Sequence, residues 1–139
     1  MSITDQEEIL ARIAAALERI APPVPVRVDL DAHPAYRWDG KIITPIEDFS
    51  PVDYALLAGI DAQKKACFEN TRRLALGHAA HDILLWGARG TGKSATVAAC
   101  IGEVQREGLP LAMVEVATDD LRRLAALFPL LRASSRPII

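Results

Sequence analysis

One glycine-rich stretch restricts the fold of this chain more than any other feature. Residues 87–94 read Gly-Ala-Arg-Gly-Thr-Gly-Lys-Ser and fit the pattern Gly-x-x-x-x-Gly-Lys-[Ser/Thr] at every fixed position. Backbone N–H groups can hold a polyphosphate only where the chain wraps it closely, and glycines supply the positive φ angles and the missing Cβ atoms for such wrapping. We therefore predict a phosphate-binding loop whose glycines are Gly87, Gly90 and Gly92.

Two side chains at the end of this loop have predicted roles. The Lys93 ammonium is expected to reach the β- and γ-phosphates of a nucleotide as a compact charge. The Ser94 hydroxyl is expected to ligate a Mg²⁺ ion that bridges the same two phosphates. The predicted cofactors are thus ATP or ADP with Mg²⁺, bound by a set of neighbouring residues: Gly87, Gly90, Thr91, Gly92, Lys93, Ser94 and Ala95.

The flanks of the loop agree with this interpretation. Residues 83–86 form a short unbroken apolar run, typical of a parallel strand covered on both faces. After Ser94, apolar residues recur at helical spacing until Gly108 ends the segment. The predicted helix directs its N-terminal N–H groups and the positive end of its dipole at the phosphates.

Composition places the chain among globular proteins. Half of the 139 residues are hydrophobic, enough to bury a core in one modest domain. A formal net charge of −2 supplies no basic field for nucleic acid or anionic lipid, so a nucleic-acid partner is unsupported, although the charge does not exclude it. The acidic first residues and the absence of a long apolar run predict a cytoplasmic protein without a membrane span.

The cysteines and histidines are not spaced as metal ligands. Cys67 and Cys100 have no CxxC spacing and are expected to be buried, reduced thiols rather than a disulfide or a metal site. His78 and His81 form an HxxH pair without an evident third ligand, so we interpret them as loop histidines.

The N-terminal region divides into two parts. Thr4 and Glu7 fit a capping box and predict an amphipathic helix that ends before Pro22-Pro23. Its apolar face could pack on the body of the domain or on a neighbouring subunit; it consists of Ile9, Leu10, Ile13, Leu17 and Ile20. Residues 22–58 contain six prolines and are predicted to form a structured connector.

Within this connector, residues 24–30 alternate as a short edge strand would, although the prolines also allow an irregular path. The large aromatic residues Tyr36, Trp38 and Phe49 are expected to anchor the connector to the core of the domain rather than to a partner.

The remaining segments alternate between helix and strand. A helix is predicted to begin at Asp61 and to stop at Gly77, and residues 111–116 are predicted to form the second strand of a βαβ unit. A helix start at 118–120 follows, Pro129 is expected to open a second short helix, and residues 136–139 begin another strand.

The sequence resembles the AAA+ ATPases and, more closely, an uncharacterised bacterial family, DUF815, for which AAA+ ATPase activity is predicted. The resemblance covers roughly residues 54–139. The matching stretches are residues 57–64, Asn70-Thr71-Arg72, residues 84–94, Asp120-Leu121 and residues 130–132. It implies an α/β fold of the P-loop NTPase type, with a parallel sheet flanked by helices.

The resemblance also implies site residues and a domain division. Leu57, Gly59 and Ile60 are expected to lie by the adenine. Residues 1–53 form an N-terminal helix and Pro-rich connector, and residues 54–139 form the N-terminal half of an AAA+-like domain. The acidic Walker B pair is expected beyond Ile139, so the chain is predicted to be an N-terminal fragment without catalytic residues that binds nucleotide with little hydrolysis.

One internal alternative places the acidic site on the chain itself. Glu115 lies in the strand predicted at 111–116, and Asp119 and Asp120 follow that strand, as an acidic site would require. However, the strand comes immediately after the phosphate-loop helix. We therefore favour Asp119 and Asp120 as acids of a helix start.

Three functions remain open. The favoured one is an AAA+ ATPase that remodels or loads a macromolecular partner, in the full-length protein as a homo-oligomeric ring. A small-molecule P-loop kinase usually carries its loop near the N-terminus, whereas about 80 residues precede it here. The third is a switch or scaffold that binds ATP without turnover.

Overall fold

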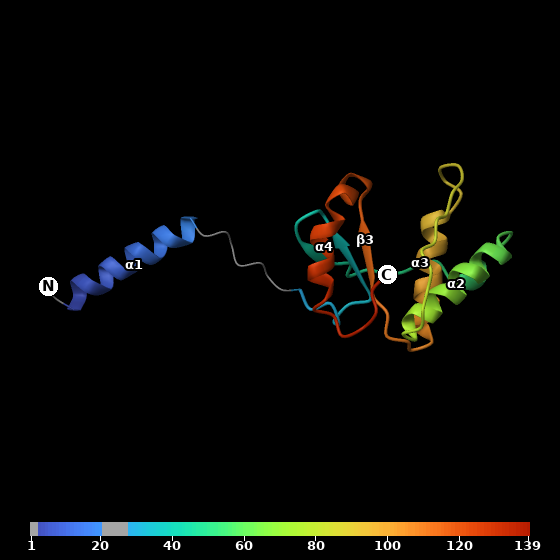
Figure 1. Cartoon of the computed structure of the whole chain (residues 1–139), viewed down its shortest axis with the longest axis horizontal. Coiled ribbons are helices and arrows are strands. Elements are labelled where there is room, and N and C mark those ends of the chain that lie inside the picture. Colours follow the sequence, from blue (N-terminus) through green and yellow to red (C-terminus); the bar gives the residue numbers. More distant parts are fainter. Residues whose placement is uncertain (1–2, 21–27) are drawn as a thin grey trace.

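The computed structural model describes residues 3–20 and 28–139, with side chains in the first helix described for residues 6–17. Residues 28–139 have an α/β architecture, with a small mixed sheet flanked by helices (Figure 1). The central strand β1 (Ala35–Trp38) pairs antiparallel with β2 (Ile43–Pro45) and parallel with β3 (Met113–Val116). The prediction of a purely parallel sheet is therefore wrong at this edge.

The antiparallel edge is produced by a tight hairpin. Gly40 has a φ of 88° between the two strands, a conformation that favours glycine. The Asp39 carboxylate accepts hydrogen bonds from the N–H groups of Lys41 and Ile42, both at 2.9 Å. These bonds lower the pKa of Asp39 and turn the chain back beside β1.

Helix residues pack on both faces of the sheet, and successive side chains of β3 point to opposite faces. Ala112, Val114 and Val116 pack with the cluster that contains Tyr36, Trp38 and Leu127 of α4 (Leu124–Leu131). On the other face, residues 111 and 113 pack toward α3 (Lys93–Arg106).

The aromatic residues of the connector belong to this core. Tyr36 and Trp38 are almost completely buried, and Phe49 packs against the α3 side. The prediction that they anchor the connector to the domain is confirmed. The sheet joins strands from both sides of the predicted boundary between residues 53 and 54. Of the predicted strand at 24–30, residues 24–27 lie outside the described part, and residues 28–30 are not in a strand.

Two helices pack side by side. The 3-10 turn η1 (Tyr54–Leu56) leads into α2 (Asp61–Ala75), which contacts α3 along its length. Gly77, with a φ of 73°, follows the end of α2, as predicted. Lys64 lies level with Cys100, and Arg72 lies level with Glu107, so the two helices run in the same direction.

The predicted strand at residues 83–86 is not formed. The segment is extended but lies in no sheet, and Leu84 and Trp86 are 85% and 88% exposed. A strand is defined by hydrogen bonds to a neighbour, and the described residues place none beside this segment. Apolar sequence alone gave the wrong prediction here.

The segments after β3 agree with the predictions only in part. Asp119 and Asp120 lie in the first turn of the 3-10 helix η2 (Thr118–Arg123), as expected of helix-start acids. Pro129 lies inside α4 and does not open a second helix; without an N–H it cannot donate to the Ala125 carbonyl, so α4 lacks that hydrogen bond. Ile138 forms a parallel bridge with Ala112, so the predicted strand at 136–139 begins beside β3.

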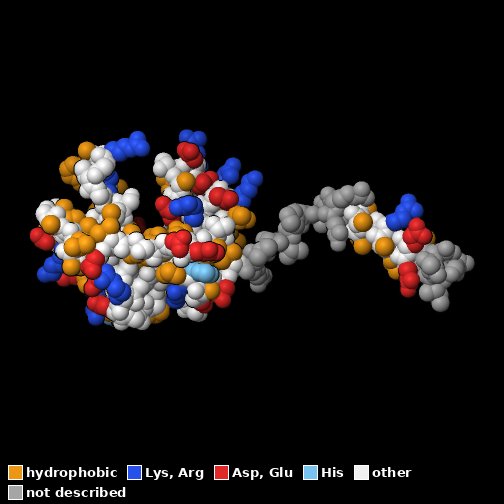
Figure 2. Space-filling view, turned by 180° about the vertical axis from the view of Figure 1, so that it is seen from behind, with side chains coloured by type: hydrophobic (Ala, Val, Ile, Leu, Met, Phe, Trp, Pro, Cys, Tyr) orange, Lys and Arg blue, Asp and Glu red, His pale blue; other side chains and the backbone are white. Residues whose placement is uncertain are grey.

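The N-terminal segment forms helix α1 (Ile3–Ile20), as predicted. The Thr4 side chain and Pro22-Pro23 lie outside the described part, so the cap and the stop stay predictions. The apolar side chains described on α1 are exposed at the surface (Figure 2). None of the described helices is both long and apolar enough to cross a membrane.

Candidate nucleotide-binding site

The glycine loop connects the exposed segment 83–86 to the start of α3 and projects beyond that helix (Figure 1). Gly87, Gly90 and Gly92 have φ angles of 141°, 84° and 82°. A Cβ atom added to Gly90 or Gly92 would meet nothing within 4 Å. Glycine is therefore required here by backbone conformation, and the space beside the loop is open to a ligand.

The N-terminus of α3 offers free N–H groups beside the loop. Gly92 is the N-cap residue and has no side chain that could satisfy the N–H groups of the first turn. The first helical hydrogen bond runs from the Thr96 N–H to the Gly92 carbonyl at 2.8 Å, and the Thr96 hydroxyl donates to the same oxygen. The N–H groups of Lys93, Ser94 and Ala95 precede this first bond and have no acceptor within the helix. Such groups can bind an anion.

The Lys93 side chain folds back across the loop. Its ammonium donates to the carbonyl oxygens of Gly87 at 3.0 Å and Ala88 at 2.6 Å, and lies 3.4 Å from the Thr91 hydroxyl oxygen. Thr91 in turn donates to the Ala88 carbonyl at 2.9 Å. An ammonium has three N–H donors, and the contact with Thr91 is the longest of the three. A phosphate oxygen could replace this contact without opening the loop.

Ser94 lies exposed in the first turn of α3 and borders a hollow of about 570 Å³ between α3 and the sheet. The hollow also contains Glu115 of β3 and Arg37 of β1, which the sequence pattern did not connect with the loop. The Glu115 carboxylate accepts two hydrogen bonds from the Arg37 guanidinium, at 2.9 and 3.0 Å. Glu115 is therefore paired within the sheet, which argues against its use as the acidic site.

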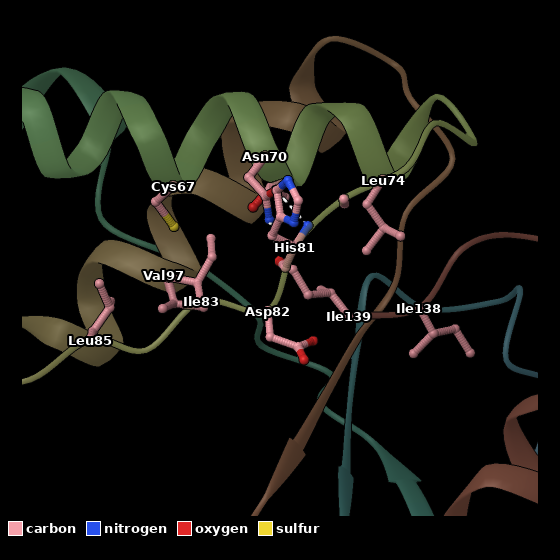
Figure 3. A pocket seen from close by; sticks show the side chains of 12 residues that line it. Cys67, Asn70, Leu74, His81, Asp82, Ile83, Leu85, Val97, Ile138 and Ile139 are labelled. Atoms are coloured by element: carbon pink, nitrogen blue, oxygen red, sulfur yellow. Dashed lines mark hydrogen bonds between the residues drawn. The ribbon is translucent and has the colours of Figure 1, made fainter.

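Two side chains of α2 attach the stretch that precedes the loop. Arg73 donates to the Ala79 carbonyl at 3.0 Å. The Asn70 amide donates to the His81 carbonyl at 2.7 Å and accepts from the His81 N–H at 2.9 Å. Beyond this contact, Ile83 and Leu85 are among the residues that line a largely apolar cavity of about 490 Å³ between α2, α3 and residues 138–139 (Figure 3). The lining of this cavity is largely apolar, whereas the positive-φ glycines and the uncapped start of α3 lie at the loop, so the loop is the better candidate for an anion site.

The residues expected near the adenine lie in the turn between η1 and α2. Gly59 has a φ of 76° in this turn. The Lys64 ammonium donates to the Leu57 carbonyl at 2.9 Å and to the Tyr54 carbonyl at 3.3 Å, and so fixes the turn. The turn precedes α2, and the glycine loop precedes α3. Because the two helices run in the same direction, the turn and the loop lie at the same end of the helix pair. Sequence reasoning gave no role to Lys64 or to Asn70, although both lie in the family-matched stretches.

The two cysteines face each other between α2 and α3, and both are buried and unbridged. The Cys100 thiol donates to the Lys64 carbonyl at 3.6 Å. Interaction between the two neighbouring thiols raises the pKa of Cys100 and lowers the pKa of Cys67. In the described part of the chain, no three His, Cys, Asp or Glu side chains lie close enough together to hold a metal ion.

Comparison with known proteins identifies the family. A family model described as "Protein of unknown function (DUF815)" matches residues 31–139, most of the chain. Neither a curated protein nor a solved structure matches the sequence. The match covers the sheet, the glycine loop and α2 to α4. The chain belongs to the DUF815 family.

Proposed function

We propose that residues 87–95 bind the phosphates of ATP or ADP, and that the chain is the nucleotide-binding part of an AAA+-type ATPase. One observation carries the proposal: a loop with three positive-φ glycines leads directly into an uncapped helix whose first residue, Lys93, holds its ammonium over the loop. Backbone donors, the helix dipole and a fixed positive charge converge there, which is the chemistry that polyphosphate binding needs.

A Mg²⁺ ion fits the exposed Ser94 hydroxyl, because hydroxyl and phosphate oxygens are the hard ligands that this ion prefers. When bound, Mg²⁺ would neutralise charge on the phosphates. In the same proposal, the turn at Leu57, Gly59 and Ile60 contacts the adenine. Its position at the same end of the helix pair as the loop supports this assignment.

The direct test is calorimetric titration of ATP and of ADP, each with and without Mg²⁺, into the full chain. Lys93→Ala should weaken binding at least about a hundredfold, because it removes a charge that contacts the phosphates. Lys65→Ala is the matched control, since Lys65 is an exposed lysine that pairs with Glu69 on α2; it should leave affinity unchanged. Equal affinity of wild type and Lys93→Ala would refute the proposed site.

Phosphate release distinguishes the classes of function. We expect this chain to bind nucleotide with little turnover, because positioning of water and completion of the Mg²⁺ shell require acidic groups that we do not assign here. Stimulation of release by a protein or DNA would support remodelling of a macromolecular partner. Transfer of phosphate to an added metabolite would instead support a kinase.

A further inference from the structure

Helix α1 exposes a continuous apolar face. The described side chains of Ile9, Leu10, Ile13 and Leu17 are between 45% and 65% exposed. In a single amphipathic helix these positions would be expected to lie against a core. The residues that the structure describes do not cover them, so a partner that covers this face would stabilise the helix.

The spacing of the apolar residues fits a second helix. Leu10 and Leu17 are seven residues apart, as are Ile13 and Ile20, so the face repeats with the period of a coiled-coil seam. Ile9, Ile13 and Ala16 border a shallow hollow on the helix surface. Such a hollow is the shape that receives one side chain of a facing helix in knobs-into-holes packing.

The charges along α1 indicate which partner fits its apolar face and in which direction a facing helix runs. The first half of α1 is acidic, with Asp5, Glu7 and Glu8. The second half is net positive, because it carries Arg12 and Arg19 and one acidic residue, Glu18. Two copies packed antiparallel place acidic halves against basic halves and oppose the two helix dipoles. A parallel pair would place the acidic halves together. The acidic excess on α1 also disfavours an anionic membrane, which attracts basic helices.

We propose that α1 is a self-association element that pairs antiparallel with α1 of a second copy of this chain. The pairing joins two chains through their N-terminal helices and needs no bound nucleotide. It is therefore independent of the phosphate site.

Sedimentation of the full chain over a micromolar to millimolar concentration series tests the proposal. The wild type should form a dimer, and Leu10→Glu should weaken it at least about a hundredfold, because two leucines leave the seam of each dimer. Ala11→Glu adds the same charge at the next, exposed position outside the seam and should leave the dimer unchanged. Leu10→Ala, which retains helix propensity, should weaken the dimer in the same direction. A monomeric wild type, or a Leu10→Glu dimer of unchanged affinity, overturns the proposal.

Charge reversal tests the orientation. Glu7→Lys/Glu8→Lys makes α1 basic along its length, and Arg12→Glu/Arg19→Glu makes it acidic, so each double variant should dimerise more weakly than the wild type. A mixture of the two should recover a heterodimer. Failure of the mixture to pair would contradict the antiparallel arrangement. Lys93→Ala should dimerise like the wild type, which separates failure of this proposal from failure of the nucleotide site.

Discussion

The two segments that flank the glycine loop differ in how they are held. Helix α3, which follows the loop, buries Ala99, Cys100, Ile101 and Val104 completely. Segment 83–86, which precedes the loop, exposes Leu84 and Trp86 almost completely. The loop is thus fixed mainly on its C-terminal side. Of the groups assigned to the phosphates, Lys93, Ser94 and the first-turn N–H groups lie on that fixed side.

The largest expected effect of this difference is on stability. Ile101→Ala should lower the free energy of unfolding by about 3 kcal/mol, because it leaves a cavity in the tightly packed contact of α3. Leu84→Ala should change it by less than about 0.5 kcal/mol, because the side chain lies at the surface. Urea unfolding followed by circular dichroism measures both. A comparable loss in Leu84→Ala would show that the two flanks are equally packed in solution.

A second prediction tests how tightly α3 packs against the connector. A Cβ added to Gly102 would lie 2.5 Å from Cγ of Pro51, an atom of a rigid ring. Gly102→Ala should therefore destabilise the fold by about 1–2 kcal/mol, although alanine is the better helix former. The same unfolding experiment tests this. A variant more stable than the wild type would mean that Pro51 yields easily, and that α3 is less fixed than we infer.

A third prediction concerns the metal. Ser94→Ala should weaken nucleotide binding about tenfold in the presence of Mg²⁺ and much less in its absence, because only the metal ligand is removed. Calorimetry with Mg²⁺ and with a chelator separates the two effects. Equal loss under both conditions would assign Ser94 to the phosphates rather than to the ion.

The smallest expected effect concerns a polar contact far from the loop. This contact joins Asp31, near the start of residues 28–139, to Ser134 and Ser135, near their end. Hydrogen bonds from Ser135 and Ser134 lower the pKa of the exposed Asp31 carboxyl. Because the folded pKa is depressed, the stabilisation is present above the unfolded pKa and is lost as pH falls through the folded value. Asp31→Asn should therefore be slightly less stable than the wild type near pH 6, and the difference should be smaller near pH 3, as unfolding at both pH values can measure. An equal difference at both pH values would contradict this role.

The sequence was informative where a signal is local. The glycine spacing predicted the positive φ angles, and periodicity with a terminal glycine predicted α2 and α3. Burial of Tyr36 and Trp38 followed from their size alone. These features depend on a few neighbouring residues, so one sequence is enough to predict them.

Pairing between distant segments was less predictable. Residues 83–86 have the composition of a buried strand, but a strand also needs a neighbour, and composition does not supply one. Strand β1 was missed, although the Asp39-Gly40 dipeptide is a hairpin signal that could have revealed it. In the candidate site, Lys64 and Asn70 donate to backbone carbonyls seven and eleven residues away, so their roles depend on the path of the chain and not on the matching stretches that contain them.

The most direct measurement is an amide spectrum of the isotope-labelled full chain, recorded while ADP and Mg²⁺ are added. We predict saturable shifts of the Gly90, Gly92, Lys93 and Ser94 amides that are lost in Lys93→Ala, because these N–H groups would contact the phosphates. Loop amides that stay unchanged at millimolar ADP, or shifts confined to the cavity beside Asn70 and His81, would contradict the assignment of the phosphate site.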